Sequence, residues 1–106
     1  MTFKSFFKKK RLEDKAWLVR VRSIPCILTN NPEGNDPAHI RYGFLCASDK
    51  PDDDLVLPLR HDMHVAQHNH RGGEIGFWRE VMAHDDHFMM ECVKAYARQL
   101  YRENNP

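Results

Sequence analysis

The chain has 106 residues, of which 42% are hydrophobic and 29% charged, an ordinary balance for a soluble globular protein. A chain of this length can form one domain with a single modest core. No apolar run approaches the roughly 20 residues that cross a bilayer. The start, M-T-F-K-S-F-F-K-K-K-R, lacks the apolar stretch and cleavage site of a secretory signal. We therefore expect a cytoplasmic protein without a membrane partner.

Charge is distributed unevenly along the chain. The net charge is only +1, but the first 22 residues carry eight lysines and arginines against two acids, giving +6. The other residues carry eight basic and thirteen acidic groups, giving −5. A basic arm at residues 1–10 on a more acidic body suits contact with a phosphate backbone. The alternative is a solvated tail whose lysines only aid solubility.

The three cysteines, Cys26, Cys46 and Cys92, are widely spaced and odd in number. Because no C-x-x-C pair exists, the sequence indicates neither a disulfide framework nor an intact zinc knuckle. We expect three reduced thiols, with Cys92 packed in the core.

The first half of the chain is predicted to contain one helix and two short strands. Leu12, Ala16 and Val19 fall on one side of that helix, and Trp17 and Leu18 widen this side. Pro25 ends the helix. The turn-rich run N-N-P-E-G-N-D-P separates the strands. The expected elements are a helix at 9–23, a strand at 26–28, a turn segment at 30–37 and a strand at 38–42.

The second half is predicted to contain one strand and three helices. Pro58 restricts the strand to an edge or an end of a sheet, and Gly72-Gly73 separates the first two helices. The expected elements are a strand at 55–59, a helix from 61 or 62 to 69, a helix at 74–82, and a last helix from Asp85 or Asp86. The expected core face of the last helix is Met89, Cys92, Val93, Tyr96 and Leu100. The fold class is therefore α+β.

Three histidines stand out as candidates for chemistry. His64 and His68 are four residues apart where a helix is predicted, so both rings share one face and can bind one metal ion. His39 lies on a different segment, next to a short apolar run, and is placed to act on a water beside that ion.

The segment from residue 26 to 68 resembles the HNH endonucleases, also called the ββα-metal or His-Me finger fold, in the compact form common in phages and prophages. The motifs that carry the resemblance are P-A-H-I-R, K-P-D-D-D, L-V-L-P-L, H-x-x-x-H and the trailing G-E-x-x-x-F-W. The resemblance implies a finger of a short β-hairpin plus a helix at 26–70, flanked by an N-terminal and a C-terminal helix. Residues 11–106 would form one domain in a bacterial or phage-infected cell.

The resemblance also implies a role for each candidate residue. By position, His39 is the general base, and His64 and His68 are ligands of one divalent ion, Mg²⁺ or Mn²⁺ with Zn²⁺ or Ni²⁺ as alternatives. An acid, Asp53 or Asp54, fills the place of the family's usual asparagine and either orients His39 or approaches the metal. The register leaves both acids open.

The sequence departs from the family at two places. Many relatives carry a further metal ligand directly before the base, where this chain has Ala38. Relatives also often hold a structural zinc, but only one of the four corresponding positions here is a zinc ligand; they are Cys26, Thr29, Arg60 and Met63. We therefore expect no structural zinc, a Cys26 without a task, and a finger held by packing of Leu28, Met63, Trp17 and the last helix.

The function implied by these residues is metal-dependent hydrolysis of phosphodiester bonds in duplex or branched DNA, by a monomer or a homodimer. The residues expected to contact phosphates are Lys8, Lys9, Lys10, Arg11 and Arg41. The remaining histidines, His61, His70, His84 and His87, are expected at the surface. The alternatives are an inactive relative that serves as a nucleic-acid-binding or phage accessory protein, and a histidine-rich protein that stores or senses metal.

Overall fold

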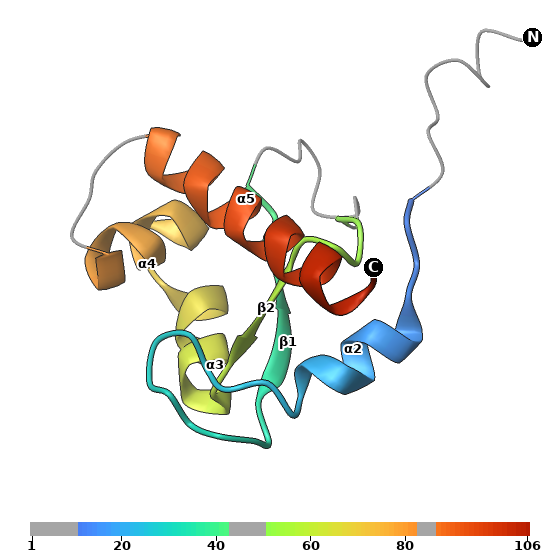
Figure 1. Cartoon of the computed structure of the whole chain (residues 1–106). Coiled ribbons are helices and arrows are strands. Elements are labelled where there is room, and N and C mark those ends of the chain that lie inside the picture. The colour runs from blue at the N-terminus through green and yellow to red at the C-terminus, as the bar shows by residue number, and fades with distance from the viewer. Residues whose placement is uncertain (1–10, 43–50, 83–86) are drawn as a thin grey trace, which may run out of the picture.

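The computed structural model describes residues 11–42, 51–82 and 87–106, with the side chains of the last range from residue 89 (Figure 1). These residues form a small α+β domain, as predicted. None of the described helices combines the length and apolar character that a bilayer crossing requires. The elements in chain order are α2 (Lys15–Val21), β1 (Asp36–His39), β2 (Val56–Leu59), α3 (His61–Asn69), α4 (Gly73–Met82) and α5 (His87–Asn104).

The two strands form an antiparallel hairpin, with Asp36 opposite Leu59 and His39 opposite Val56. The Ile40 N–H extends the pairing by donating to Leu55 O at 2.8 Å. Because each strand is an edge of this two-stranded sheet, Pro58 is tolerated, as predicted. β2 is buried along its whole length, and helices α2, α3 and α5 pack against it.

The core gathers around the hairpin and one face of α5. Ile40 and Leu57 from the hairpin lie in one cluster with Trp78 of α4 and with Met90 and Ala97 of α5. Of the predicted face of α5, Met89 and Val93 are buried and Leu100 packs at the edge, but Cys92 and Tyr96 are exposed. That part of the prediction was wrong because α5 carries apolar residues on several faces. The small Ala97, rather than Tyr96, belongs to the face that packs into the cluster.

Helix α2 begins at Lys15, six residues later than predicted from residue 9. The Asp14 side chain caps it by accepting the Trp17 N–H at 3.0 Å. Leu12 is instead held along the 52–53 segment: its carbonyl accepts the Asp53 N–H at 3.0 Å, and its N–H donates to Asp52 at 2.8 Å. The predicted apolar side is only partly right, since Trp17 is buried with Val21 while Val19 is 65% exposed.

Residues 26–28 form a turn and not the predicted strand. The Asn30 N–H donates to Cys26 O at 2.8 Å, and Asn30 takes a left-handed φ of 61°. Buried Asn35 closes the same loop by donating to Ile24 O and Asn31 O at 2.8 and 2.9 Å. These hydrogen bonds satisfy much of the backbone inside the loop, and the Ile27 N–H donates outside it, to Pro58 O of β2 at 3.2 Å. The predicted strand at 38–42 lies instead at 36–39, α3 and α4 match their predictions, and the predicted cap of α5 at residues 85–86 lies outside the described residues.

Candidate active site

His39 ends β1 and contacts a buried carboxylate. Its Nε2 lies 2.9 Å from Asp53 Oδ1, and the side chains of His39 and Asp53 are 29% and 4% exposed. Asp54 points elsewhere, with Oδ2 3.8 Å from the Arg98 guanidinium. Of the two acids that the sequence leaves open, Asp53 is therefore the one in contact with His39. Of the two roles that the sequence left open for this acid, orienting His39 or approaching the metal, contact with the ring fits the first.

Three donors converge on the Asp53 carboxylate. Besides the His39 ring, the Arg11 guanidinium donates to Oδ1 at 3.1 Å and the Asp14 N–H donates to Oδ2 at 2.8 Å. Burial alone would raise the pKa of Asp53, but these hydrogen bonds and the Arg11 charge hold it below its ordinary value. Asp53 is therefore ionised at neutral pH.

The ionised Asp53 dictates which nitrogen of the His39 ring carries the proton. A carboxylate only accepts hydrogen bonds, so Nε2 must be the donor. In the neutral ring the lone pair then lies on Nδ1. Within the part of the chain that the structure describes, Nδ1 has no hydrogen-bond partner. His39 thus offers a free base in a fixed orientation.

A hollow of about 460 Å³ opens beside His39 and Asp53. Its lining side chains include three cations, from Arg11, Lys15 and Arg41, and two carboxylates, from Glu13 and Asp53. The Arg11 guanidinium is also bound to Asp53, Pro51 O and Glu13, so it is held in place at the wall. A hollow with a base and three cations suits an anionic substrate group.

His64 and His68 lie on one face of α3, as the spacing predicts. Their Nε2 atoms are 3.1 Å apart, and their ring centroids are 4.8 Å apart. A zinc ion at the usual Zn–N distance of about 2.1 Å from both nitrogens would have an N–Zn–N angle of about 95°. Burial, followed by the charges of His64 and Arg41, lowers the pKa of His68, so its ring is neutral at pH 7. The 3.1 Å contact is itself a hydrogen bond, so without an ion one Nε2 donates and the other accepts, and the donating ring must lose that proton to bind a metal.

Arg41 is common to the surroundings of the base and of the paired imidazoles. Arg41 lines the hollow beside His39, and its charge lowers the pKa of His68 on α3. Across residues 11–42, 51–82 and 87–106, no three His, Cys, Asp or Glu side chains surround a common point in the way a complete metal site would. Among the described residues, His64 and His68 are therefore a pair of candidate ligands and not a complete metal site.

Sequence reasoning missed two carboxylates at this site. Asp36, assigned to the turn segment, contacts the rings of His61 and His64. Glu74 accepts the N–H of Arg41 at 3.0 and 2.8 Å and of Tyr42 at 3.1 Å, which fixes the chain just after β1. Burial raises the pKa of Glu74. Only the family-like G-E pair before F-W pointed to Glu74, and no local signal pointed to Asp36.

The surface assignments of the other histidines hold in part. His61 is 78% exposed, although Asp36 holds its ring. His70 is only 27% exposed; its Nε2 lies 2.7 Å from Glu80, and its ring sits against Gly76. His70 therefore ties the end of α3 to α4. The side chains of His84 and His87 and the phosphate-contact candidates Lys8, Lys9 and Lys10 lie outside the described residues.

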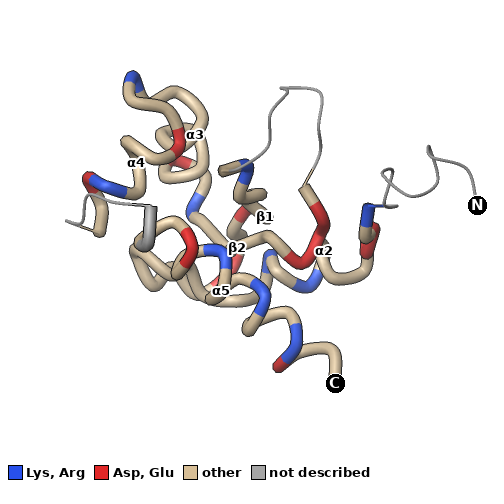
Figure 2. Tube along the Cα trace, turned by 90° about the horizontal axis from the view of Figure 1, so that it is seen from above, with Lys and Arg blue, Asp and Glu red and all other residues tan. Residues whose placement is uncertain are grey.

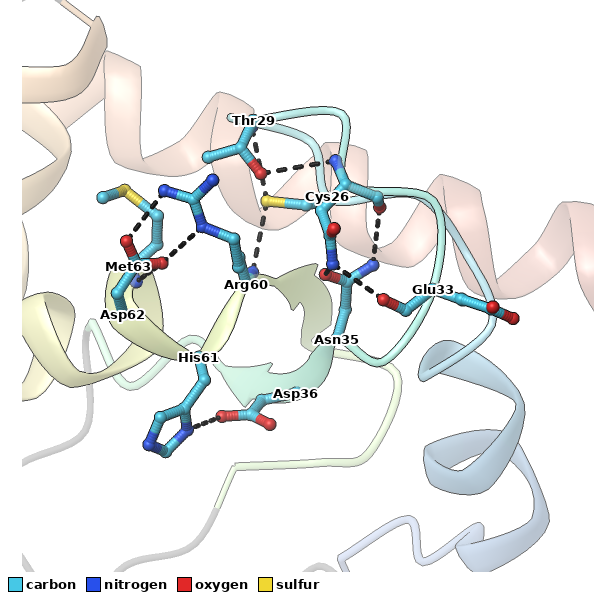
Figure 3. Close-up of polar contacts among 10 residues, drawn as sticks. Cys26, Thr29, Glu33, Asn35, Asp36, Arg60, His61, Asp62 and Met63 are labelled. Carbon is cyan, nitrogen blue, oxygen red and sulfur yellow. Dashed lines mark hydrogen bonds and ion pairs between the residues drawn. The ribbon is translucent and has the colours of Figure 1, made fainter.

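Cys26 has a structural task that the sequence did not reveal. Its buried Sγ accepts the N–H of Arg60 at 3.2 Å and of Thr29 at 3.4 Å (Figure 3). Burial opposes ionisation of the thiol, but these hydrogen bonds hold the pKa of Cys26 below its ordinary value. The Arg60 side chain turns to Asp62, at 2.6 and 2.8 Å. Hydrogen bonds to one sulfur thus join the 26–29 turn to the start of α3.

Packing contributes at the same place, as predicted. Leu28 and Met63 pack against the larger core cluster, and Trp17 forms a second cluster with Val21 and Val56. Lysine and arginine also recur along α5, at Lys94, Arg98 and Arg102, which sequence reasoning did not single out (Figure 2).

Comparison with family models, with curated proteins and with solved structures finds no match for this chain.

Proposed function

We propose that this protein is a metal-dependent endonuclease of the HNH type that hydrolyses DNA phosphodiester bonds. The observation that carries the proposal is the pair of His39 and ionised Asp53 beside a hollow lined by cations. The paired imidazoles of α3, with facing Nε2 atoms, support it. The hairpin followed directly by α3 is compatible with a ββα-metal finger, to which we assign residues 26–70.

His39 acts as the general base in this reaction. Its Nδ1 takes a proton from a water molecule, whose oxygen attacks the phosphorus in line with the leaving oxygen. Asp53 remains anionic and stabilises the imidazolium that forms. The cations of Arg11, Lys15 and Arg41 hold the phosphate at the wall of the hollow. By the family pattern the products carry a 5′-phosphate and a 3′-hydroxyl.

The donor set of α3 fits a single divalent ion. His64 and His68 would hold it by Nε2, and when bound it supplies a Lewis acid that stabilises the leaving oxygen. Two imidazole ligands suit Mn²⁺, Zn²⁺ or Ni²⁺ better than Mg²⁺, which prefers oxygen ligands. Water and substrate oxygens complete the coordination, so we expect the ion to bind more tightly when DNA is present.

The substrate is held by its sugar-phosphate backbone. The cations that line the hollow bind phosphate without reading bases, so cutting is directed by DNA structure and not by a base sequence. Residues 1–10, with Lys8, Lys9 and Lys10, continue from Arg11, which is anchored to Asp53 beside the base. We assign this arm to the flanking phosphates and keep a homodimer as the arrangement for cutting both strands.

A nucleic-acid-binding module without activity is the second candidate. It is favoured by the incomplete set of metal ligands among the described residues and by Ala38 at the family's ligand position. This candidate predicts DNA binding without hydrolysis under every divalent ion. A protein that stores metal predicts metal binding without DNA binding.

Plasmid nicking separates these functions. With Mn²⁺ or Mg²⁺, the parent protein should nick supercoiled plasmid, and His39→Ala should slow nicking by about 10²–10⁴-fold, the usual contribution of a general base. Metal binding and the circular dichroism spectrum should not change in the variant, and added imidazole should restore part of its rate. A His39→Ala protein that cuts as fast as the parent would refute the general-base assignment. DNA binding by the parent without cutting would establish the binding module.

A further inference from the structure

Asp36 holds two histidine rings with one oxygen. Its Oδ2 lies 2.7 Å from Nδ1 of His61 and 2.9 Å from Nδ1 of His64; Figure 3 shows the contact with His61. The hairpin register explains this placement. Asp36 pairs with Leu59, and α3 begins two residues after Leu59, so the first strand residue faces the first turn of the helix.

The geometry determines which nitrogen of each ring carries a proton. An ionised carboxylate only accepts hydrogen bonds, so both rings must present N–H at Nδ1. In the neutral rings, Nε2 then carries the lone pair. For His64 this is the nitrogen that lies 3.1 Å from Nε2 of His68. Asp36 therefore leaves the metal-facing nitrogen of His64 free of its proton.

Asp36 stands on β1 two residues before Ala38, the position at which the resemblance would place a metal ligand. Residues two apart on a strand share a face, so Asp36 and Ala38 point to the same side. The Ala38 methyl group cannot bind a metal. The Asp36 carboxylate instead contacts His64, one of the two candidate ligands on α3. The strand thus contributes to the centre by fixing a ligand.

We propose that Asp36 is a positioning residue of the metal centre: it holds His64 in the Nδ1–H form and aims Nε2 at the ion shared with His68. His61 occupies the same carboxylate oxygen but lies 78% exposed at the start of α3. It therefore provides a matched control, because removing it takes one ring away from Asp36 and leaves the contact with His64.

The first experiment determines the tautomer of the His64 ring in the absence of metal. Long-range ¹H–¹⁵N NMR of the metal-free protein distinguishes the two tautomers of each histidine, with His64→Ala used for assignment. We expect the Nδ1–H form for His64 in the parent and in His61→Ala. In Asp36→Ala we expect His64 to shift to the Nε2–H form or to a mixture. If His64 keeps the Nδ1–H form in Asp36→Ala, the positioning role is wrong.

The second experiment measures zinc affinity by calorimetry at fixed pH. Loss of a carboxylate behind a ligating histidine weakens binding by about 10–100-fold in known sites, so we expect that loss in Asp36→Ala and parent affinity in His61→Ala. Asp36→Asn retains one acceptor oxygen and should lose less, which also serves as the readout if the alanine variant fails to fold. Parent affinity in both Asp36 variants would overturn the proposal.

Because the role of Asp36 depends on the metal centre of the proposed function, His64→Ala is measured beside it. Loss of zinc binding in His64→Ala is the expected result. If the parent shows no zinc binding that depends on His64, the metal centre fails and the purpose assigned to Asp36 fails with it. If His64 is required and Asp36 is not, only the positioning role fails.

Discussion

Two carboxylate–histidine units stand at opposite ends of β1, and they differ most in burial. The Asp53 side chain is 4% exposed and is held by the His39 ring, by Arg11 and by the Asp14 N–H. The Asp36 side chain is 28% exposed, and its hydrogen bonds within the described residues go to the rings of His61 and His64. Two segments of the chain, β1 and residues 11–14, hold the Asp53 carboxylate, whereas one helix, α3, holds that of Asp36.

The difference matches what the proposed function would require of each unit. A general base must keep one orientation through the reaction, so rigid support from the N-terminal segment is an advantage. A metal centre that relies on water and substrate for its remaining ligands must stay open to solvent. We therefore expect damage to the Asp53 unit to affect rate and stability together, and damage to the Asp36 unit to affect metal affinity above all.

The largest expected effect is on cleavage, in a matched pair of neighbouring variants. Asp53→Asn removes the charge that would stabilise the His39 imidazolium, so we expect a loss in kcat of about tenfold or more, up to the 10²–10⁴-fold that a general base contributes. Asp54→Asn should leave kcat unchanged, because Asp54 faces Arg98. The measurement is single-turnover nicking at saturating Mn²⁺. Equal losses in both variants would mean that contact with His39 is not what matters.

The next effect concerns the basic arm and its anchor. Removing residues 2–10 while keeping Arg11 leaves the support of Asp53 intact and deletes Lys8, Lys9 and Lys10. If those three lysines contact phosphates, the slope of log K against log salt should become less negative by up to about 2.7, at about 0.9 per contact. Fluorescence anisotropy from 50 to 300 mM salt measures it. An unchanged slope would reduce the arm to a solubility tail.

Acid sensitivity should distinguish the two carboxylates more finely. The pKa of Asp53 lies below its ordinary value of 3.8, so its contribution to stability is complete above pH 3.8 and is lost as the pH falls through the lower, folded-state pKa. At pH 6 we expect Asp53→Asn to cost about 1–3 kcal/mol, the usual range for buried hydrogen bonds to a charged group. Urea unfolding at pH 6 and near pH 2.5 measures the difference between parent and variant.

That difference should shrink as the pH falls through the folded-state pKa, because the parent carboxylate then takes up a proton. Asp36→Asn should show the same trend with a smaller amplitude, since Asp36 is more exposed and solvent screens its charge. A gap for Asp53 that does not change while its carboxylate takes up the proton would show that its hydrogen bonds do not depend on its charge.

The two units also mark how far sequence reasoning could go. Helix α3 was predicted within a residue, because glycines end it and the His64–His68 spacing needs only local helical geometry. The choice between Asp53 and Asp54 was out of reach: adjacent acids on a loop differ only in which one the N-terminal segment buries. Asp36 was invisible for a related reason, since its contact with His64 joins residues 28 apart and depends on hairpin register.

The errors in predicting the buried faces of α2 and α5 share a single cause. Apolar residues on α2 and α5 lie on more than one side, and periodicity alone does not say which side meets the hairpin. Burial of Trp17 decided the orientation of α2, and Ala97 belongs to the packed face of α5. The exposed positions of Val19, Cys92 and Tyr96 follow from those two choices.

The smallest expected effect tests Cys26, whose sulfur joins the 26–29 turn to α3. Cys26→Ala leaves the Arg60 N–H without its acceptor and should cost about 0.5–1.5 kcal/mol in unfolding free energy, the usual net value of one hydrogen bond. Cys92→Ala is the matched control, because Cys92 is exposed on α5 and its loss should be close to neutral. Cys26→Ser keeps an acceptor and should lie between them. Equal stability of the Cys26 and Cys92 alanine variants would mean that Cys26 has no structural role. We also expect that added zinc does not stabilise any of these proteins through this loop.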